Sequence, residues 1–249
     1  MNSEILRTRI DAVGPAAAVL QAAGRLASNA RPALCIVQAN VHTLVTAEED
    51  PAYERALGAA GLVVPDGMPL VWILRWRGHK NVGRVYGPDL MLMMCKRGAK
   101  EGWRCYLYGG RPGVPELLKQ RLVTRFPGLN VVGTYSPPFR ALSPEEDSAA
   151  CEAINAVKPD ILGVGLGGPK QDLWMYQHRE KLDVSVMHGV GAAFDFLSGR
   201  IPQAPRWMMN VGLEWFFRLL VEPRRLWKRY TLTNVKFVYY LIMKELFHR

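Results

Sequence analysis

Short β-rich runs alternate with segments of helical length along the first four-fifths of the sequence, and this alternation restricts the fold more than any other feature. One segment opens with Ser143-Pro144-Glu145-Glu146, which supplies an N-cap serine, a proline at the first helical position and acids at the positive end of the helix dipole. The predicted strands are Ala33–Val37, Leu62–Val64, Trp103–Tyr108, Leu129–Gly133, Asp160–Gly165 and Val184–Met187. The predicted helices include Asp89–Lys100, Val114–Phe126, Ser143–Val157 and Gln171–Lys181. This order predicts an α/β fold with a Rossmann-like, mainly parallel sheet and helices on both faces.

The sequence changes character at about Ile201, where Pro202 and Pro205 precede a stretch rich in aromatic and basic residues. Residues 200–249 hold ten Lys or Arg and three Asp or Glu, so they carry +7 of the total net charge of +10. We therefore expect two parts. Residues 1–200 form the Rossmann-like domain, called the core below, and residues 201–249 form a basic, aromatic-rich appendage.

The appendage is expected to be helical and amphipathic. Within Asn210–Val221 the polar residues Asn210, Glu214 and Arg218 recur at every fourth position, which predicts a helix with a narrow polar stripe. Pro223 should break or restart that helix, and a last helix is expected over roughly Asn234–Phe247. Basic residues beside aromatic ones suit helices that lie on an anionic lipid surface. The alternative is packing on the core or on a second subunit of a homo-oligomer.

The remaining composition points to a peripheral protein on the cytoplasmic face of the membrane. The longest apolar run near the C-terminus, Phe237–Met243, has seven residues, and about 18 are needed to cross a bilayer. Charges among the first eleven residues interrupt any secretory signal. The four cysteines are scattered, which predicts buried, reduced thiols; they are Cys35, Cys95, Cys105 and Cys151.

Two glycine-rich loops follow predicted strands. Residues Gly163–Gly168 contain G-x-G-x-x-G, in which small residues let the backbone approach phosphates. The loop comes late in the chain for a first βαβ unit, and a tight turn without a ligand explains it equally well. The loop His188–Asp195 leaves the same two alternatives open.

A carboxylate follows the second predicted strand, in the turn Val64-Pro65-Asp66-Gly67. Ligands of parallel sheets bind beyond the carboxyl ends of the strands, so Asp66 is placed where a general base would lie. Asp66 could equally cap the next helix, and nothing local distinguishes the two roles.

Taken in order, these pieces resemble the WecG/TagA/CpsF glycosyltransferases (glycosyltransferase family 26) over roughly residues 33 to 230. The matching segments are Val37–Asn40, Val63–Gly67, Tyr108–Gly110, Gly165–Asp172, Gly189–Asp195 and Gly212–Leu219, followed by Glu222-Pro223. The resemblance implies an inverting, metal-independent transferase without a cofactor. It further implies a UDP-sugar donor, a polyprenyl-diphosphate-linked acceptor and an appendage that contacts the anionic membrane and completes the active site.

The same resemblance implies roles for individual residues. Asp66 matches the catalytic base, and Arg218, Arg225 and Lys228 match bases that reach the leaving diphosphate. Lysine in the third position lacks the bidentate fork of arginine, and Arg229 is the other candidate. The expected substrate-binding residues are Gln38, Asn40, Gln171 and Asp195, and Gln38 stands where members commonly have threonine. Glycines expected near the nucleotide are Gly109, Gly110, Gly165, Gly167 and Gly191.

Several alternatives stay open at this point. The donor is expected to carry an N-acetylmannosamine-type sugar, with a glucosyl or uronic-acid donor as the alternative. The Gly163–Gly168 loop leaves room for a dinucleotide-dependent oxidoreductase. The basic, aromatic appendage leaves room for a nucleic-acid-binding protein, although no nucleic acid is the expected partner. No Asp-x-Asp motif or Cys/His cluster is present to bind a metal, so protein cations are expected to neutralise a leaving diphosphate.

Overall fold

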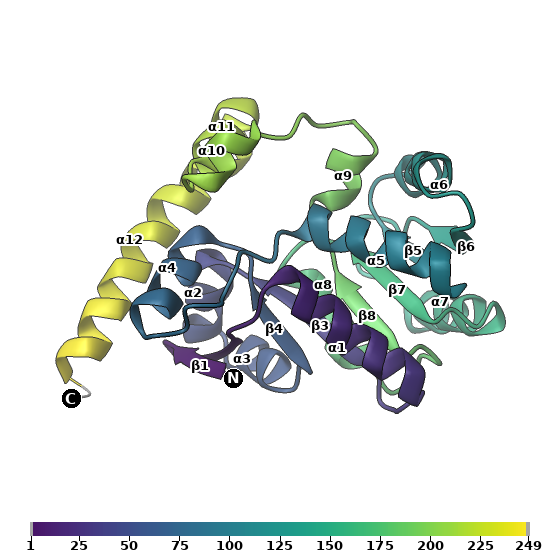
Figure 1. Ribbon diagram of the computed structural model, residues 1–249, viewed down its shortest axis with the longest axis horizontal. Helices are drawn as coiled ribbons and strands as arrows, with labels where there is room; N and C mark the ends of the chain where they lie inside the picture. The colour runs from purple at the N-terminus through teal and green to yellow at the C-terminus, as the bar shows by residue number, and fades with distance from the viewer. Residues whose placement is uncertain (1, 248–249) are drawn as a thin grey trace.

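The computed structural model describes residues 2–247, apart from the side chains of Arg225, Arg229 and residues 245–247 (Figure 1). Its centre is a six-stranded parallel sheet with the strand order β4-β3-β8-β7-β5-β6. The strands are β3 (Leu34–Ala39), β4 (Leu62–Pro65), β5 (Arg104–Gly109), β6 (Asn130–Tyr135), β7 (Ile161–Gly165) and β8 (Val186–Gly189). All six predicted strands are confirmed, with ends within two residues of those expected.

Helices cover both faces of the sheet, as the alternation predicts. In β3, Ile36 packs into one hydrophobic core while its neighbours Cys35 and Val37 pack into the other, because successive strand side chains point to opposite faces. The helices on the Ile36 face are α1 (Pro15–Ser28), α5 (Gly87–Glu101), α6 (Val114–Arg125) and α9 (Ala193–Leu197). Those on the opposite face are α2 (Val41–Glu49), α3 (Pro51–Gly58), α4 (Met68–Trp76), α7 (Pro144–Ala156) and α8 (Lys170–His178).

An N-terminal hairpin was not expected from the sequence. Strands β1 (Asn2–Ile5) and β2 (Thr8–Asp11) pair in antiparallel fashion. Ile5 and Ile10 are fully buried in the hydrophobic cluster on the Cys35 and Val37 face of the sheet. The Asp11 carboxylate accepts a hydrogen bond from the Val63 amide of β4 at 2.9 Å. Such short strands carry little periodicity of their own, so tertiary packing decides that they form.

The described part of the appendage, residues 201–247, forms three helices: α10 (Arg206–Asn210), α11 (Glu214–Val221) and α12 (Pro223–Phe247). The single helix expected over Asn210–Val221 is wrong at its start, because the chain turns between α10 and α11. Gly212 has a φ of +79°, and a Cβ there would come within 3.0 Å of the Trp72 ring on α4. The turn therefore needs a glycine both for its backbone and for its contact with the core.

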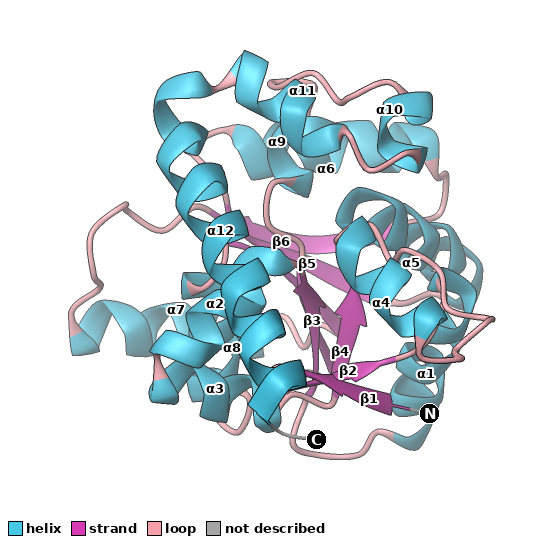
Figure 2. Cartoon of the chain, turned by 90° about the vertical axis from the view of Figure 1, so that its left-hand side faces the viewer, coloured by secondary structure: helices cyan, strands magenta, loops and turns pink. Residues whose placement is uncertain are grey.

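Pro223 restarts the helix as expected, but α12 begins there and not at Asn234. It runs along α2, with buried Phe237 against the core (Figure 2). Lys236 pairs with Glu49 of α2 at 2.6 Å, and Lys244 pairs with Glu4 at 2.9 Å. None of the helices that the structure describes combines the length and the apolar character needed to cross a membrane.

Candidate active site

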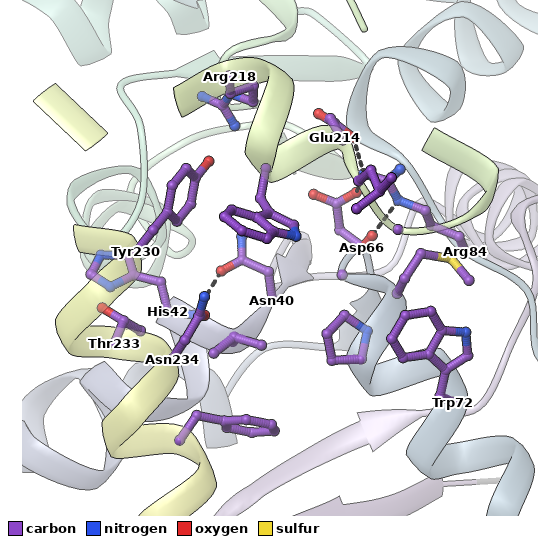
Figure 3. A pocket seen from close by; sticks show the side chains of 18 of the residues that line it. Asn40, His42, Asp66, Trp72, Arg84, Glu214, Arg218, Tyr230, Thr233 and Asn234 are labelled. Atoms are coloured by element: carbon purple, nitrogen blue, oxygen red, sulfur yellow. Dashed lines mark hydrogen bonds and ion pairs between the residues drawn. The ribbon is translucent and has the colours of Figure 1, made fainter. Parts of the chain in front are cut away.

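A cavity of about 460 Å³ lies at the carboxyl ends of β3 and β4, beneath the appendage (Figure 3). Among the described residues, eleven of the twenty that line it belong to the appendage, so neither part encloses the cavity alone. The polar and aromatic lining of the core consists of Asn40, His42, Asp66, Trp72 and Arg84. That of the appendage consists of Glu214, Trp215, Arg218, Tyr230, Thr233, Asn234 and Phe237.

The turn after β4 fixes the predicted base Asp66. The amides of Asp66 and Gly67 both donate to the Ala39 carbonyl at the end of β3, at 2.8 and 3.3 Å. Helix α4 has Gly67 at its N-cap, so the Asp66 carboxylate does not cap that helix. This removes one of the two roles that the sequence left open, and the carboxylate lines the cavity instead.

Arg84 joins the base to the appendage. Its Nη2 lies 3.3 Å from Asp66 Oδ1 and 2.5 Å from Glu214 Oε2, and its Nε donates to the Asp66 carbonyl. The three side chains are between 11% and 21% exposed. The Val85 amide donates to the Pro65 carbonyl at 2.8 Å and holds this segment against β4. The sequence analysis did not identify Arg84, because no local motif surrounds it.

Burial raises the pKa of Asp66 to about 6. The Arg84 guanidinium lowers this pKa, the Glu214 carboxylate raises it, and Arg218 lowers it again by a smaller amount. A carboxylate with such a pKa is ionised at pH 7 but is a much stronger base than an exposed aspartate, which suits a general base.

Asn40 is held at the rim of the cavity by a capping box at the start of α2. Its Oδ1 accepts from the amides of His42 and Thr43 at 3.0 and 3.3 Å, and its own amide donates to Thr43 Oγ1 at 3.2 Å. These bonds fix the carboxamide in one orientation. The predicted substrate residue Asn40 and the predicted base Asp66 are therefore brought together.

Arg218 is the predicted diphosphate-binding base that the structure places in the cavity. Its guanidinium lies 5.5 Å from the Phe196 ring centre, and its buried Nε has no hydrogen-bond partner among the described residues. An unsatisfied buried guanidinium donor is costly without an anion. The arrangement therefore suits an anionic ligand group.

The other two predicted bases lie differently. Lys228 is exposed on α12, with its ammonium 5.7 Å from the Trp227 ring centre, and it does not line the cavity. The side chains of Arg225 and of the alternative base Arg229 lie outside the described residues.

The other predicted substrate residues lie farther along the carboxyl edge of the sheet. Gln38 contacts His188 through their Nε2 atoms at 2.9 Å, and Gln171 Oε1 accepts from the Gly191 amide at 2.9 Å. Asp195 on α9 pairs with Arg200 at 3.5 Å. None of the three predicted residues lines the 460 Å³ cavity.

The glycine loops bring strand ends into close contact. The Gly110 amide donates to the Gly165 carbonyl at 2.9 Å. A Cβ at Gly109 would come within 2.6 Å of Gly165, and one at Gly165 within 2.8 Å of the Phe194 ring. Close packing thus explains why these positions are glycine. The lack of side chains also leaves backbone groups uncovered at the carboxyl edge of the sheet. Gly167 and Gly191 have positive φ angles of +78° and +53°, which glycine adopts most easily.

A group with metal-binding residue types lies away from this cavity. Ligand atoms of Asp147, Cys151 and His178 fall within 4.8 Å of one another. His178 Nε2 lies 2.9 Å from both Asp147 oxygens, and its Nδ1 lies 2.7 Å from the Trp174 carbonyl. These bonds fasten α7 to α8 and account for the polar groups involved. The sequence did not indicate this group, because its members come from two helices.

Sequence reasoning also missed Glu214, His42, Trp72, Tyr230 and Asn234. For Glu214 a signal existed, since it belongs to the polar stripe Asn210, Glu214 and Arg218. In the structure Asn210 is exposed at the end of α10, whereas the two members on α11 turn inward: Glu214 is buried and Arg218 is partly buried in the cavity. A narrow polar stripe on an otherwise apolar helix can thus indicate a polar site beneath it.

A comparison with protein-family models matches residues 3–249 to the Glycosyl transferase WecG/TagA/CpsF family. The match covers both the core and the appendage. It supports glycosyl transfer over an oxidoreductase and over a nucleic-acid-binding protein.

Proposed function

The chain belongs to the WecG/TagA/CpsF family (glycosyltransferase family 26), whose members act in the synthesis of cell-surface polysaccharides, and from this premise we propose its reaction. A sugar passes from a UDP-sugar to a polyprenyl-diphosphate-linked saccharide, with inversion and without a metal ion. An N-acetylmannosamine-type donor is favoured over a glucosyl or uronic-acid donor. The observation that carries the proposal is the cavity itself, which holds one basic carboxylate, Asp66, beneath an appendage arginine, Arg218.

Asp66 acts as the general base. It accepts the proton of an acceptor hydroxyl while that oxygen attacks the anomeric carbon from the side opposite the leaving group. The bond between the anomeric carbon and the β-phosphate oxygen breaks, and its electron pair leaves with UDP. General-base assistance of this kind contributes roughly 10²–10⁴ in rate.

Arg218 stabilises the leaving diphosphate. Negative charge grows on the β-phosphate as UDP departs, and Arg218, which lines the cavity and whose buried Nε has no hydrogen-bond partner among the described residues, supplies a positive charge beside it. A well-placed donor in a dry site is worth about 10²–10³ in rate. Arg225 extends this role on α12, whereas Lys228 lies outside the cavity, and the nucleotide lies along the edge formed by Gln171, Asp195 and the glycine loops.

The appendage also binds the cytoplasmic face of an anionic membrane. On α11 the polar residues Glu214 and Arg218 face the cavity, whereas Phe216 and Leu220 are 43% and 65% exposed. An apolar outer face beside basic residues suits an interface with anionic lipid. An appendage bound to lipid in this way would hold Asp66 and Arg218 near a lipid-linked acceptor.

The test is a UDP-release assay with a panel of UDP-sugars and a short-chain lipid-diphosphate saccharide as the acceptor. Release that depends on both substrates supports the proposal, and inverted stereochemistry of the product supports in-line attack. Release from none of the donors would overturn it.

The same assay tests metal independence. We expect full activity in EDTA, because Arg218 and its neighbours supply the positive charge. Complete loss in EDTA that Mg²⁺ or Mn²⁺ restores would contradict the metal-free mechanism.

A further inference from the structure

Two carboxylates from distant parts of the chain share one guanidinium. Asp66 follows β4, Arg84 lies between α4 and α5, and Glu214 is the first residue of α11. Arg84 Nη2 is 2.5 Å from Glu214 and 3.3 Å from Asp66. Of the two carboxylates, that of Glu214 in the appendage lies closer to Arg84 Nη2 (Figure 3), while Arg84 Nε also donates to the backbone carbonyl of Asp66.

Glu214 is held in place by this contact. Its side chain is only 11% exposed, and a buried carboxylate without a partner is strongly disfavoured. The Tyr86 ring lies 4.5 Å from the Arg84 guanidinium and limits its movement on another side. Charge balance therefore joins α11 to the turn that carries Asp66.

The charged and titratable groups around Asp66 come from four parts of the chain, one of them α12, from which Tyr230 lines the same cavity. Arg84 and Tyr86 come from the segment before α5, Glu214 and Arg218 from α11, and His42 from α2 lines the same cavity. Of these, Glu214 is the negative group that competes with Asp66 for Arg84. Without it, the guanidinium could turn fully to the base and form a tight ion pair.

We propose that Glu214 is a positioning residue: by holding Arg84 from the appendage side, it keeps the Asp66 carboxylate only partly ion-paired and therefore able to accept a proton. The inference rests on the proposed role of Asp66 as the base. It makes the competence of the base depend on the docking of α11 onto the core. An appendage lifted from the core would leave Asp66 paired with Arg84 and a weak base.

The direction of the effect follows from the charges. Glu214 raises the pKa of Asp66 and Arg84 lowers it. Glu214→Gln removes the negative charge that raises the pKa of Asp66. It also frees Arg84 to pair more closely with Asp66, which lowers that pKa further. The pKa of Asp66 should then fall, and the base should lose strength with it.

The test compares Glu214→Gln with a matched control, Glu49→Gln. The control removes a different contact between the core and the appendage, the ion pair of Glu49 with Lys236, and leaves the surroundings of Asp66 intact. In Glu214→Gln we expect the acid limb of kcat/KM against pH to move down by about one pH unit and the plateau to fall roughly tenfold. In Glu49→Gln both should stay as in the wild type. Glu214→Asp keeps the charge and should restore part of both.

A second readout does not depend on transfer. The Asp66 carboxyl is titrated by carbon NMR, with Asp66→Asn to assign its signal, and its midpoint should fall in Glu214→Gln but not in Glu49→Gln. If no variant transfers any sugar while the midpoint shifts as expected, the proposed function fails and the coupling stands. An unmoved acid limb and midpoint in a folded Glu214→Gln protein would overturn the inference, as would an equal shift in Glu49→Gln. If Glu214→Gln does not fold, the same comparison is made with Glu214→Ala, which also removes the charge, and an unmoved limb and midpoint in that variant overturn it.

Discussion

At the scale of residues, the position of Asp66 explains why an ordinary aspartate can serve as a base at neutral pH. The turn after β4 places it in a cavity where burial disfavours its charge, and Arg84 offsets that effect in part. We predict that Asp66→Asn lowers transfer by roughly 10²–10⁴ while UDP binding persists, as measured by UDP release and by calorimetry. Turnover like that of the wild type would exclude Asp66 as the base.

The stability of that variant provides its control. The pKa of Asp66 is raised from 3.8 to about 6 in the folded protein, so folding favours the protonated side chain. The stability that this protonation contributes is fully present below the unfolded pKa and is lost as the pH rises through the folded pKa. At pH 7.5 the ionised side chain therefore opposes folding. Asp66→Asn should unfold at the same or a higher denaturant concentration, which separates loss of catalysis from loss of fold.

The same pKa predicts the pH dependence of transfer. Asp66 must be ionised to accept a proton, so kcat/KM should fall below about pH 6 with a single ionisation. The measurement is initial UDP release at subsaturating donor concentration across the acid range. A limb near pH 4 would mean that the base is a solvent-exposed carboxylate elsewhere.

At the scale of elements, α11 has its polar side inside and its apolar side outside. We predict that Phe216→Ser with Leu220→Ser weakens binding to anionic vesicles by at least tenfold, because each exposed side chain that enters lipid contributes up to about 1.5–3 kcal/mol. Transfer to a short, water-soluble acceptor should continue. The matched control is Leu20→Ser, because Leu20 on α1 is 62% exposed and lies outside the appendage. If this variant loses vesicle binding to the same extent, α11 does not form a specific membrane-binding face.

At the scale of the whole molecule, the cavity exists only where the core and the appendage meet. We predict that a chain ending before Arg206 loses transfer even to a water-soluble acceptor, because it lacks the eleven described lining residues of the appendage, Arg218 among them. UDP release by the truncated chain is compared with that of the full chain, and circular dichroism verifies its fold. If the truncated chain transfers sugar as well as the full chain does, the appendage is only an anchor and Arg218 has no role at the diphosphate.

The sequence by itself determined the six strands, the restart at Pro223 and the strand-end position of Asp66, because propensity, periodicity and turn chemistry act over a few residues. Tertiary structure decided the strand order, the turn between α10 and α11, and the inward orientation of Glu214 and Arg218. It also decided the site: Arg84 lies 18 residues from Asp66 and 130 from Glu214 along the chain. No local pattern encodes such a meeting, since it arises only when packing of α11 and α12 on the core brings buried charges within reach of one another.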